Sequence, residues 1–138
     1  MELVKKIIRW LLGTVLLVIG LMGTFDHLSN GYDPESVGIL LYGDIFRNLH
    51  NSIMLSYMGI VIRVLHIVIG VLLFTKKYWF VGLLIHLPIA FNIFCIHVFH
   101  DLPFAHAFFF SMGMFVSLTT FFLVFLEKHR LKPLLILN

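Results

Sequence analysis

Hydrophobic residues occupy this chain in four long runs that are separated by short polar segments. The runs cover approximately residues 7–25, 52–74, 78–99 and 104–126. Each run has about 20 residues, which is the length that an α-helix needs to cross the apolar core of a bilayer. The pattern therefore predicts an all-α, integral membrane protein with four transmembrane helices in a single domain, residues 1–138.

The longest connection between the runs, residues 26–51, carries a helical pattern of its own. Asp33 followed by Pro34 is a favourable helix start, and apolar residues recur after it at spacings of three and four. We expect a short amphipathic helix that lies on the outer interface or caps the bundle. Two roles are open for it: a cover over helix ends, or a lid over a ligand entrance.

The composition indicates a chain that is solvated by lipid. Hydrophobic residues make up 60% of its 138 residues and charged residues 12%, whereas soluble proteins carry about 25% charged residues. The net charge of +3 does not come from a basic face, because the charges cluster at the ends of the apolar runs. This distribution argues against a nucleic-acid partner. The single cysteine, Cys95, excludes an internal disulfide and a C-x-x-C redox pair.

The basic residues predict the orientation of the helices. Eight of the ten Lys and Arg residues would lie on one side of the membrane, namely Lys5, Lys6, Arg9, Lys76, Lys77, Lys128, Arg130 and Lys132. Because Lys and Arg mark the cytoplasmic side of membrane proteins, we expect both termini in the cytoplasm. The compartment that we expect is the inner membrane of a bacterium.

Small and polar residues recur along one face of each predicted helix. In the second run they have spacings of 4-3-4-3-4, and the members of this stripe are Ser52, Ser56, Gly59, Arg63, His66 and Gly70. Small residues let membrane helices approach closely, and polar residues are kept away from lipid. The stripes should therefore face one another in an antiparallel four-helix bundle with a polar interior.

Two histidines mark a candidate ligand site in this bundle. His66 and His86 each lie about eight residues, or roughly 12 Å, from the cytoplasmic ends of their helices. An antiparallel hairpin would therefore bring the two imidazoles to one level. Arg63 lies one turn further out, and Asn92 follows on the third predicted helix. We expect Arg63, His66, His86 and Asn92 to bind a ligand, and the sequence identifies no catalytic residue.

Several chemistries fit these side chains. The imidazoles could hold a haem as axial ligands, bind a transition metal, or hydrogen-bond a quinone whose reduced, anionic form Arg63 would stabilise. They could also form a structural hydrogen-bond network or take part in ion conduction. A charge at mid-bilayer costs about 2.5 kcal/mol or more, and no acidic residue lies inside an apolar run to pair with Arg63. Arg63 therefore favours an anionic ligand or water, and a quinone fits the set better than a haem.

A second cluster of possible metal ligands would lie at the outer surface. The segment HVFHDLPFAH places His97, His100, Asp101 and His106 within ten residues, and such side chains bind Zn²⁺ or Cu²⁺. They are also ordinary interfacial residues at a turn, and their spacing matches no established metal motif. The chain lacks the motifs of nucleotide-binding, zinc-protease and serine-hydrolase sites, so we do not expect a hydrolase of soluble substrates.

Residues 64–99, VLHIVIGVLLFTKKYWFVGLLIHLPIAFNIFCIHVF, resemble the core of DoxX-like membrane proteins. The matching features are the helix end with Gly70, Leu72 and Leu73, the turn KKYW, Pro88, and the helix ending with Asn92, Ile93 and His97. The resemblance implies four transmembrane helices with a long outer first loop. It also implies a place among subunits linked to quinone-dependent thiosulfate oxidation, partners of redox maturation systems, or membrane chaperones. Relatives often carry an acidic residue where this chain has His66, so a carboxylate-based proton role is not expected.

The residues and the resemblance together predict a subunit or partner of a membrane redox process that is linked to quinone. The alternative is a non-catalytic scaffold, an assembly subunit or a membrane chaperone that packs against a larger membrane complex. In both cases the expected partners are the lipid bilayer and other membrane subunits. The sequence leaves open whether the chain is an enzyme.

Overall fold

The computed structural model describes residues 2–30, 57–101 and 112–131, and this part of the chain is helical without any strand. Its helices are α1 (Glu2–Asn30), α3 (Tyr57–Phe74), α4 (Trp79–Asp101), α6 (Met112–Leu126) and the short 3₁₀ helix η1 (Lys128–Arg130). Over the described residues, the four predicted helices are confirmed as helices. The amphipathic helix predicted within residues 26–51 falls almost wholly outside the described residues.

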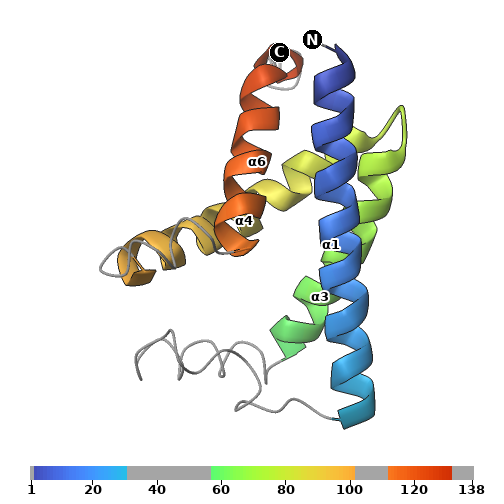
Figure 1. Ribbon diagram of the computed structural model, residues 1–138, viewed down its shortest axis with the longest axis vertical. Helices are drawn as coiled ribbons and strands as arrows, with labels where there is room; N and C mark the ends of the chain where they lie inside the picture. Colours follow the sequence, from blue (N-terminus) through green and yellow to red (C-terminus); the bar gives the residue numbers. More distant parts are fainter. Residues whose placement is uncertain (1, 31–56, 102–111, 132–138) are drawn as a thin grey trace, which may run out of the picture.

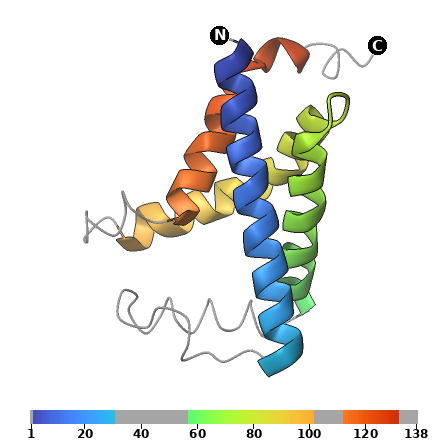
Figure 2. The ribbon, with the colours of Figure 1, turned by 45° about the vertical axis from the view of Figure 1, so that its right-hand side comes forward.

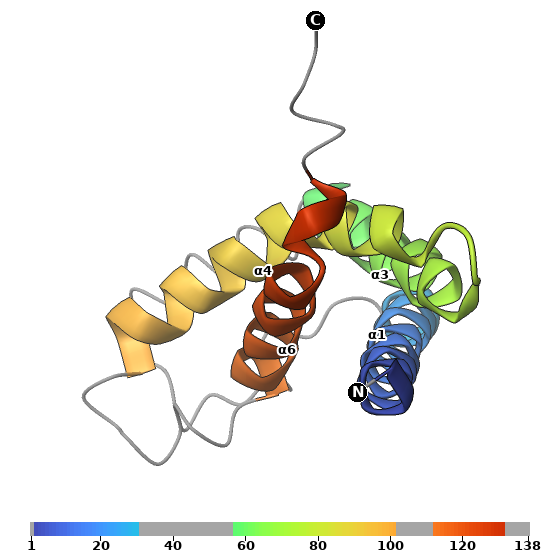
Figure 3. The same cartoon turned by 90° about the horizontal axis from the view of Figure 1, so that it is seen from above.

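The four α-helices lie beside one another in chain order. α1, α3 and α6 run roughly alongside one another, and α4 crosses obliquely (Figures 1 and 2). Contacts join α1 with α3, α3 with α4, α4 with α6, and α6 with α1, so each helix has two helical neighbours. Figure 3 shows α4 reaching from α3 past α6. The start of α1 and the end of α6 lie at the same end of the molecule, which we call the basic end for its Lys and Arg residues.

Glycines let α1 and α3 approach closely. A Cβ atom added at Gly20 would lie 2.8 Å from the backbone oxygen of Arg63 and 2.7 Å from the side chain of Ile67. A Cβ atom at Gly70 would lie 2.9 Å from the backbone oxygen of Gly13. Ordinary van der Waals contact needs roughly 3.5 Å, so neither position has room for a larger residue. The predicted packing role of the small-residue stripes is confirmed at these glycines.

A tight turn joins α3 to α4. The hydroxyl of Thr75 donates to the backbone oxygen of Leu72 at 2.8 Å and accepts the backbone N–H of Tyr78 at 3.0 Å. Tyr78 directly precedes α4, and the threonine pairs an N–H group that the start of a helix would otherwise leave without a partner. The turn therefore sets the register of the α3–α4 hairpin.

The buried apolar core draws on all four helices. Its members are Leu12, Leu16, Ile69, Leu73, Trp79, Phe80, Leu83, Val116 and Leu123. Most of these residues lie in the half of the molecule nearer the basic end, because α3 and α4 meet there at their turn. This core holds the α3–α4 hairpin against α1 and α6.

One described segment, Glu2–Phe25 of α1, is by its length and composition able to cross a membrane. The apolar parts of the other helices are shorter, and they cover Met58–Phe74, Trp79–Cys95 and Met112–Leu126. Two of the predicted spans include residues 52–56 and 104–111, which lie outside the described residues. The described structure therefore supports one membrane-spanning helix by this measure, and four apolar helices.

Candidate functional site

His66 of α3 and His86 of α4 lie side by side between the helices. The centroids of their rings are 5.7 Å apart and the ring planes meet at 61°, which is an edge-to-face arrangement. His86 is fully buried, and His66 keeps 7% of its surface exposed. This geometry confirms the prediction that the hairpin brings the two imidazoles together.

The hairpin places both rings because its register and its closeness are set locally. The Thr75 turn fixes where α4 begins relative to α3. Gly82 then lets the helices approach, since a Cβ atom there would lie 3.0 Å from the side chain of Leu72. Counting back along α3 and forward along α4 from the turn, His66 and His86 reach the same level.

A third helix supplies the hydrogen-bond partner of His86. Nδ1 of His86 lies 2.8 Å from Oγ1 of Thr120 on α6, and the hydroxyl of Thr120 donates to the backbone oxygen of Val116 at 2.8 Å. A threonine hydroxyl has one proton to donate, so Thr120 accepts from His86. This pattern assigns the proton of the neutral imidazole to Nδ1 and leaves a lone pair on Nε2.

The Nε2 atoms of both histidines are buried and have no hydrogen-bond partner among the described residues. Nearly all buried polar atoms in native proteins have a partner, and an unpaired one costs about 1–3 kcal/mol. A neighbouring buried hydroxyl obeys this rule, since Ser117 donates to the backbone oxygen of Gly113 at 2.8 Å. Within the described part of the chain, the imidazole pair therefore keeps hydrogen-bonding capacity that no protein group uses.

Arg63 is one turn from His66 on α3, but its side chain lies against α1. A Cβ atom built at Gly23 would lie 3.2 Å from Nε of Arg63 and 3.3 Å from its Cδ. Nη1 of Arg63 is buried and has no hydrogen-bond partner in residues 2–30, 57–101 and 112–131. Within the described part of the chain, no carboxylate pairs with this guanidinium.

Asn92 lies apart from the imidazole pair. Its side chain is exposed, and its amide donates to the backbone oxygen of Pro88, one turn earlier on α4, at 2.9 Å. Of the four residues proposed as a ligand site, the structure thus brings His66 and His86 into contact. It places Arg63 beside α1 and Asn92 on the outer face of α4.

The predicted outer metal cluster falls mostly beyond what the structure describes. His97, His100 and Asp101 belong to the last turns of α4, but their side chains and the whole of His106 lie outside the description. Among the described residues, no three His, Cys, Asp or Glu side chains are grouped closely enough to hold a metal ion. The same holds around His66 and His86, where a structural zinc site would need four ligands. The outer metal site stays a prediction.

The basic end holds a buried carboxylate that the sequence did not single out. Glu127 is 3% exposed and accepts hydrogen bonds from Nζ of Lys5 at 2.9 Å and from Nε of Arg130 at 2.6 Å. Burial alone would raise the pKa of the Glu127 carboxyl, but these hydrogen bonds outweigh it and hold the pKa below its usual value. The signal in the sequence was the one acidic residue in the basic segment EKHR.

The fold and the site define an all-α protein in which a buried imidazole pair on one hairpin is tied to a third helix through Thr120. Comparisons of the chain with models of protein families, with curated proteins and with solved structures found no match. The resemblance to DoxX-like proteins accordingly stays a prediction that rests on the residues of 64–99.

Proposed function

We propose that this chain is a DoxX-like integral protein of a bacterial inner membrane that binds a quinol through His66 and His86. In this proposal it serves as a subunit or partner of a quinone-linked membrane redox process. The observation that carries the proposal is the pair of buried Nε2 atoms, for which the described segments supply no hydrogen-bond partner.

The distribution of apolar side chains supports an integral membrane bundle of four antiparallel helices. Within the described residues, 26 large apolar side chains are exposed, whereas 11 apolar side chains are buried. The exposed ones occur on all four helices, and they include Val18 of α1, Val68 of α3, Phe91 of α4 and Phe122 of α6. Soluble monomers rarely expose apolar patches larger than a few hundred Å², so lipid is the solvent that fits these outer faces.

The placement of the chain ends supports cytoplasmic termini. The 2.9 Å bond from Lys5 to Glu127 joins the beginning of α1 to the residue after α6. The α3–α4 turn, with Lys76 and Lys77, points toward the same end (Figures 1 and 2). Because basic residues gather on the cytoplasmic side of membrane proteins, this end is the one that we assign to the cytoplasm.

The hydrogen bonds through Thr120 favour a ligand that donates a hydrogen bond to His86. With its proton on Nδ1, the neutral ring of His86 accepts a hydrogen bond at Nε2. A quinol presents hydroxyl groups that donate, whereas the carbonyl groups of a quinone only accept. The reduced carrier is therefore the form that suits His86.

Extraction of bound redox lipids tests this proposal. We expect wild-type protein purified in a mild detergent to carry a quinol or quinone in near-stoichiometric amount, and we expect His86→Leu and His66→Leu to lose it. The matched control is His129→Leu, which removes an exposed imidazole of η1 far from the pair. Equal quinone content in all four proteins would refute the imidazole site. A Soret band that depends on His66 and His86 would identify the ligand as a haem instead of a quinol.

The second candidate function is a scaffold or assembly subunit of a larger membrane complex. It is favoured by the exposed aromatic rings along α6, where Phe115, Phe122 and Phe125 are 40%, 48% and 64% exposed. Aromatic side chains are enriched at protein interfaces. Stoichiometric co-purification with other subunits, in the absence of any extractable redox lipid, would establish this function in place of the first.

A further inference from the structure

Two arginines lie against one tryptophan at the basic end. The guanidinium carbons of Arg9 on α1 and Arg130 on η1 are 5.1 Å and 5.2 Å from the centre of the Trp79 ring. Trp79 is itself buried, with 8% of its surface exposed. Contact with the face of an aromatic ring holds a cation in place, so both guanidinium groups are positioned before any ligand arrives.

The positive charge at this end is only partly neutralised. The first turns of α1 and the segment after α6 contribute five basic side chains, Lys5, Lys6, Arg9, Lys128 and Arg130, and two carboxylates, Glu2 and Glu127. Glu127 is already shared between Lys5 and Arg130. Nε of Arg9 is buried, and the residues that the structure describes offer it no hydrogen-bond partner. The cluster therefore has an excess of three positive charges and suits an anion.

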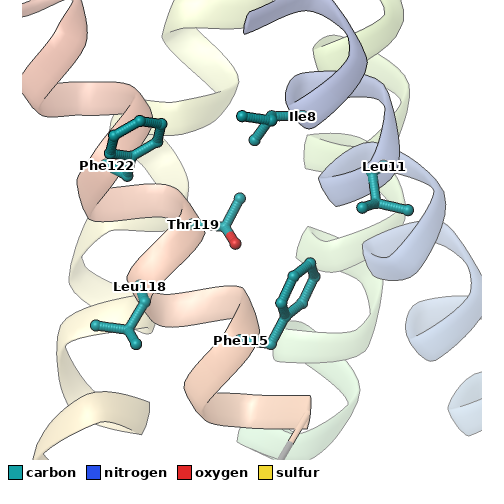
Figure 4. A pocket seen from close by; sticks show the side chains of 6 residues that line it. All are labelled: Ile8, Leu11, Phe115, Leu118, Thr119 and Phe122. Atoms are coloured by element: carbon teal, nitrogen blue, oxygen red, sulfur yellow. The ribbon is translucent and has the colours of Figure 1, made fainter. Parts of the chain in front are cut away.

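An apolar groove runs between α1 and α6 below this cluster. It has a volume of about 310 Å³ and is lined by Ile8, Leu11, Phe115, Leu118, Thr119 and Phe122 (Figure 4). This volume lies at the lower end of the roughly 300–1,000 Å³ found for small-molecule sites. With five apolar side chains among its six lining residues, the groove suits a hydrocarbon chain.

The groove and the charged cluster meet at the basic end. Lys5 lies one turn before Ile8 on α1, and Glu127 lies little more than one turn after Phe122 on α6. The ion pair between Lys5 and Glu127 thus joins α1 to the residue that follows α6, and these two helices form the walls of the groove. Lys5 and Arg130, which both bind Glu127, therefore stand at one end of the groove, and its lining is apolar apart from Thr119.

We propose that this groove binds one anionic phospholipid, with its phosphate at Arg9 and Arg130 and an acyl chain between α1 and α6. A phosphate and a hydrocarbon chain in this order are the two parts of a phospholipid that a cationic end and an apolar groove would recognise. The inference rests on the membrane location in the proposed function, but it does not depend on the imidazole pair.

Titration of the detergent-purified full chain with phosphatidylglycerol, followed by native mass spectrometry and thermal unfolding, tests the lipid site. We expect phosphatidylglycerol to bind and to raise the melting temperature more than phosphatidylcholine with the same acyl chains. Removal of one cation should weaken phosphatidylglycerol binding about fivefold, given the usual contribution of a basic residue near anionic lipid. We expect this for Arg9→Gln and Arg130→Gln. The matched control, Lys76→Gln, removes the same charge from the exposed α3–α4 turn and should leave binding unchanged.

The acyl-chain part of the site needs its own pair of variants. Leu118→Trp should fill the groove and weaken binding of both phospholipids, whereas Leu21→Trp, on an exposed part of α1 outside the groove, should not. Inorganic phosphate tests whether the phosphate alone is recognised, and we expect no stabilisation by it at millimolar concentration.

Four outcomes would overturn the proposal. Equal binding of the two phospholipids would show that the site does not recognise the negative charge of the headgroup. An equal loss of phosphatidylglycerol binding in Lys76→Gln and Arg9→Gln would show that no defined site exists. Stabilisation by inorganic phosphate as strong as that by lipid would assign the cluster to a free anion. A dimer that Leu118→Trp converts to a monomer would assign the groove to a second copy of the chain. A failure of the protein to partition into membranes would instead refute the proposed function.

Discussion

The close contact between α1 and α3 predicts how alanine at each of two neighbouring glycines changes the free energy of unfolding. At Gly20, an added Cβ atom meets the backbone oxygen of Arg63 at 2.8 Å and the backbone nitrogen of Ile67 at 3.0 Å. At Gly23, the nearest atoms belong to the flexible side chain of Arg63 and lie 3.2–3.5 Å away. Backbone atoms cannot withdraw unless the two helices separate, whereas a long side chain can shift by a few tenths of an ångström.

These contacts determine the expected free energies of unfolding. Alanine is favoured over glycine inside a helix by about 1 kcal/mol, and this gain applies to both positions. Overpacking of a tight interface costs about 1–3 kcal/mol, and this cost applies to Gly20 alone. We therefore expect Gly20→Ala to lower the free energy of unfolding by up to about 2 kcal/mol and Gly23→Ala to leave it unchanged or raise it by up to about 1 kcal/mol.

Cys95 provides the assay, because it is the only cysteine of the chain and is partly buried. Its reaction with a thiol-reactive dye during heating in detergent reports unfolding, and circular dichroism supplies an independent signal. The two variants should differ in melting temperature by on the order of 10 °C. If Gly20→Ala melts at or above the temperature of Gly23→Ala, the α1–α3 interface is not as close as the structure has it, and the reasoning fails.

Three further predictions concern the site, the basic end and the orientation. Thr120→Val should lower the free energy of unfolding by about 1–3 kcal/mol, because Nδ1 of His86 loses its acceptor, and Thr120→Ser should restore it in the same melting assay. Glu127→Gln should lower the melting temperature by a few degrees at pH 7. Since the pKa of Glu127 is lower in the folded chain than its ordinary value of 4.5, its contribution is present above pH 4.5 and lost as the pH falls below that value. The gap between wild type and Glu127→Gln should therefore narrow as the pH falls below 4.5, and a gap of undiminished size at pH 3 would contradict this. A fluorescent protein fused after Asn138 should fluoresce in bacteria, whereas an active alkaline phosphatase there would reverse the orientation.

The imidazole pair and the basic end involve the same helices but lie in different surroundings. His66 and His86 lie where α3, α4 and α6 meet, and their Nε2 atoms, which find no partner among the described residues, need one within the interior. Arg9 and Arg130 lie at an end of the bundle, where an aqueous phase and lipid headgroups would meet. Variants of one site should therefore leave ligand binding at the other unchanged.

Much of the architecture could be predicted from the sequence because it depends on short-range rules. Long apolar runs become helices in any environment that excludes water, and the observed ends of α3 at Phe74 and α6 at Leu126 agree with the predicted ones. The rise per residue of a helix is constant and the α3–α4 turn is short, so the approach of His66 to His86 followed from counting residues. The glycine stripes likewise indicated where helices would touch.

Only the tertiary structure decided which neighbour each polar side chain meets. Asn92 lies six residues after His86, and at 3.6 residues per turn this spacing turns it away from the buried face, where it is exposed. Thr120 became the partner of His86 through the register of α6 against α4, which no local pattern encodes. Glu127 was buried by the meeting of two segments 122 residues apart in the chain. Such contacts depend on how whole helices rotate and slide against one another, and packing of the complete set of side chains determines that.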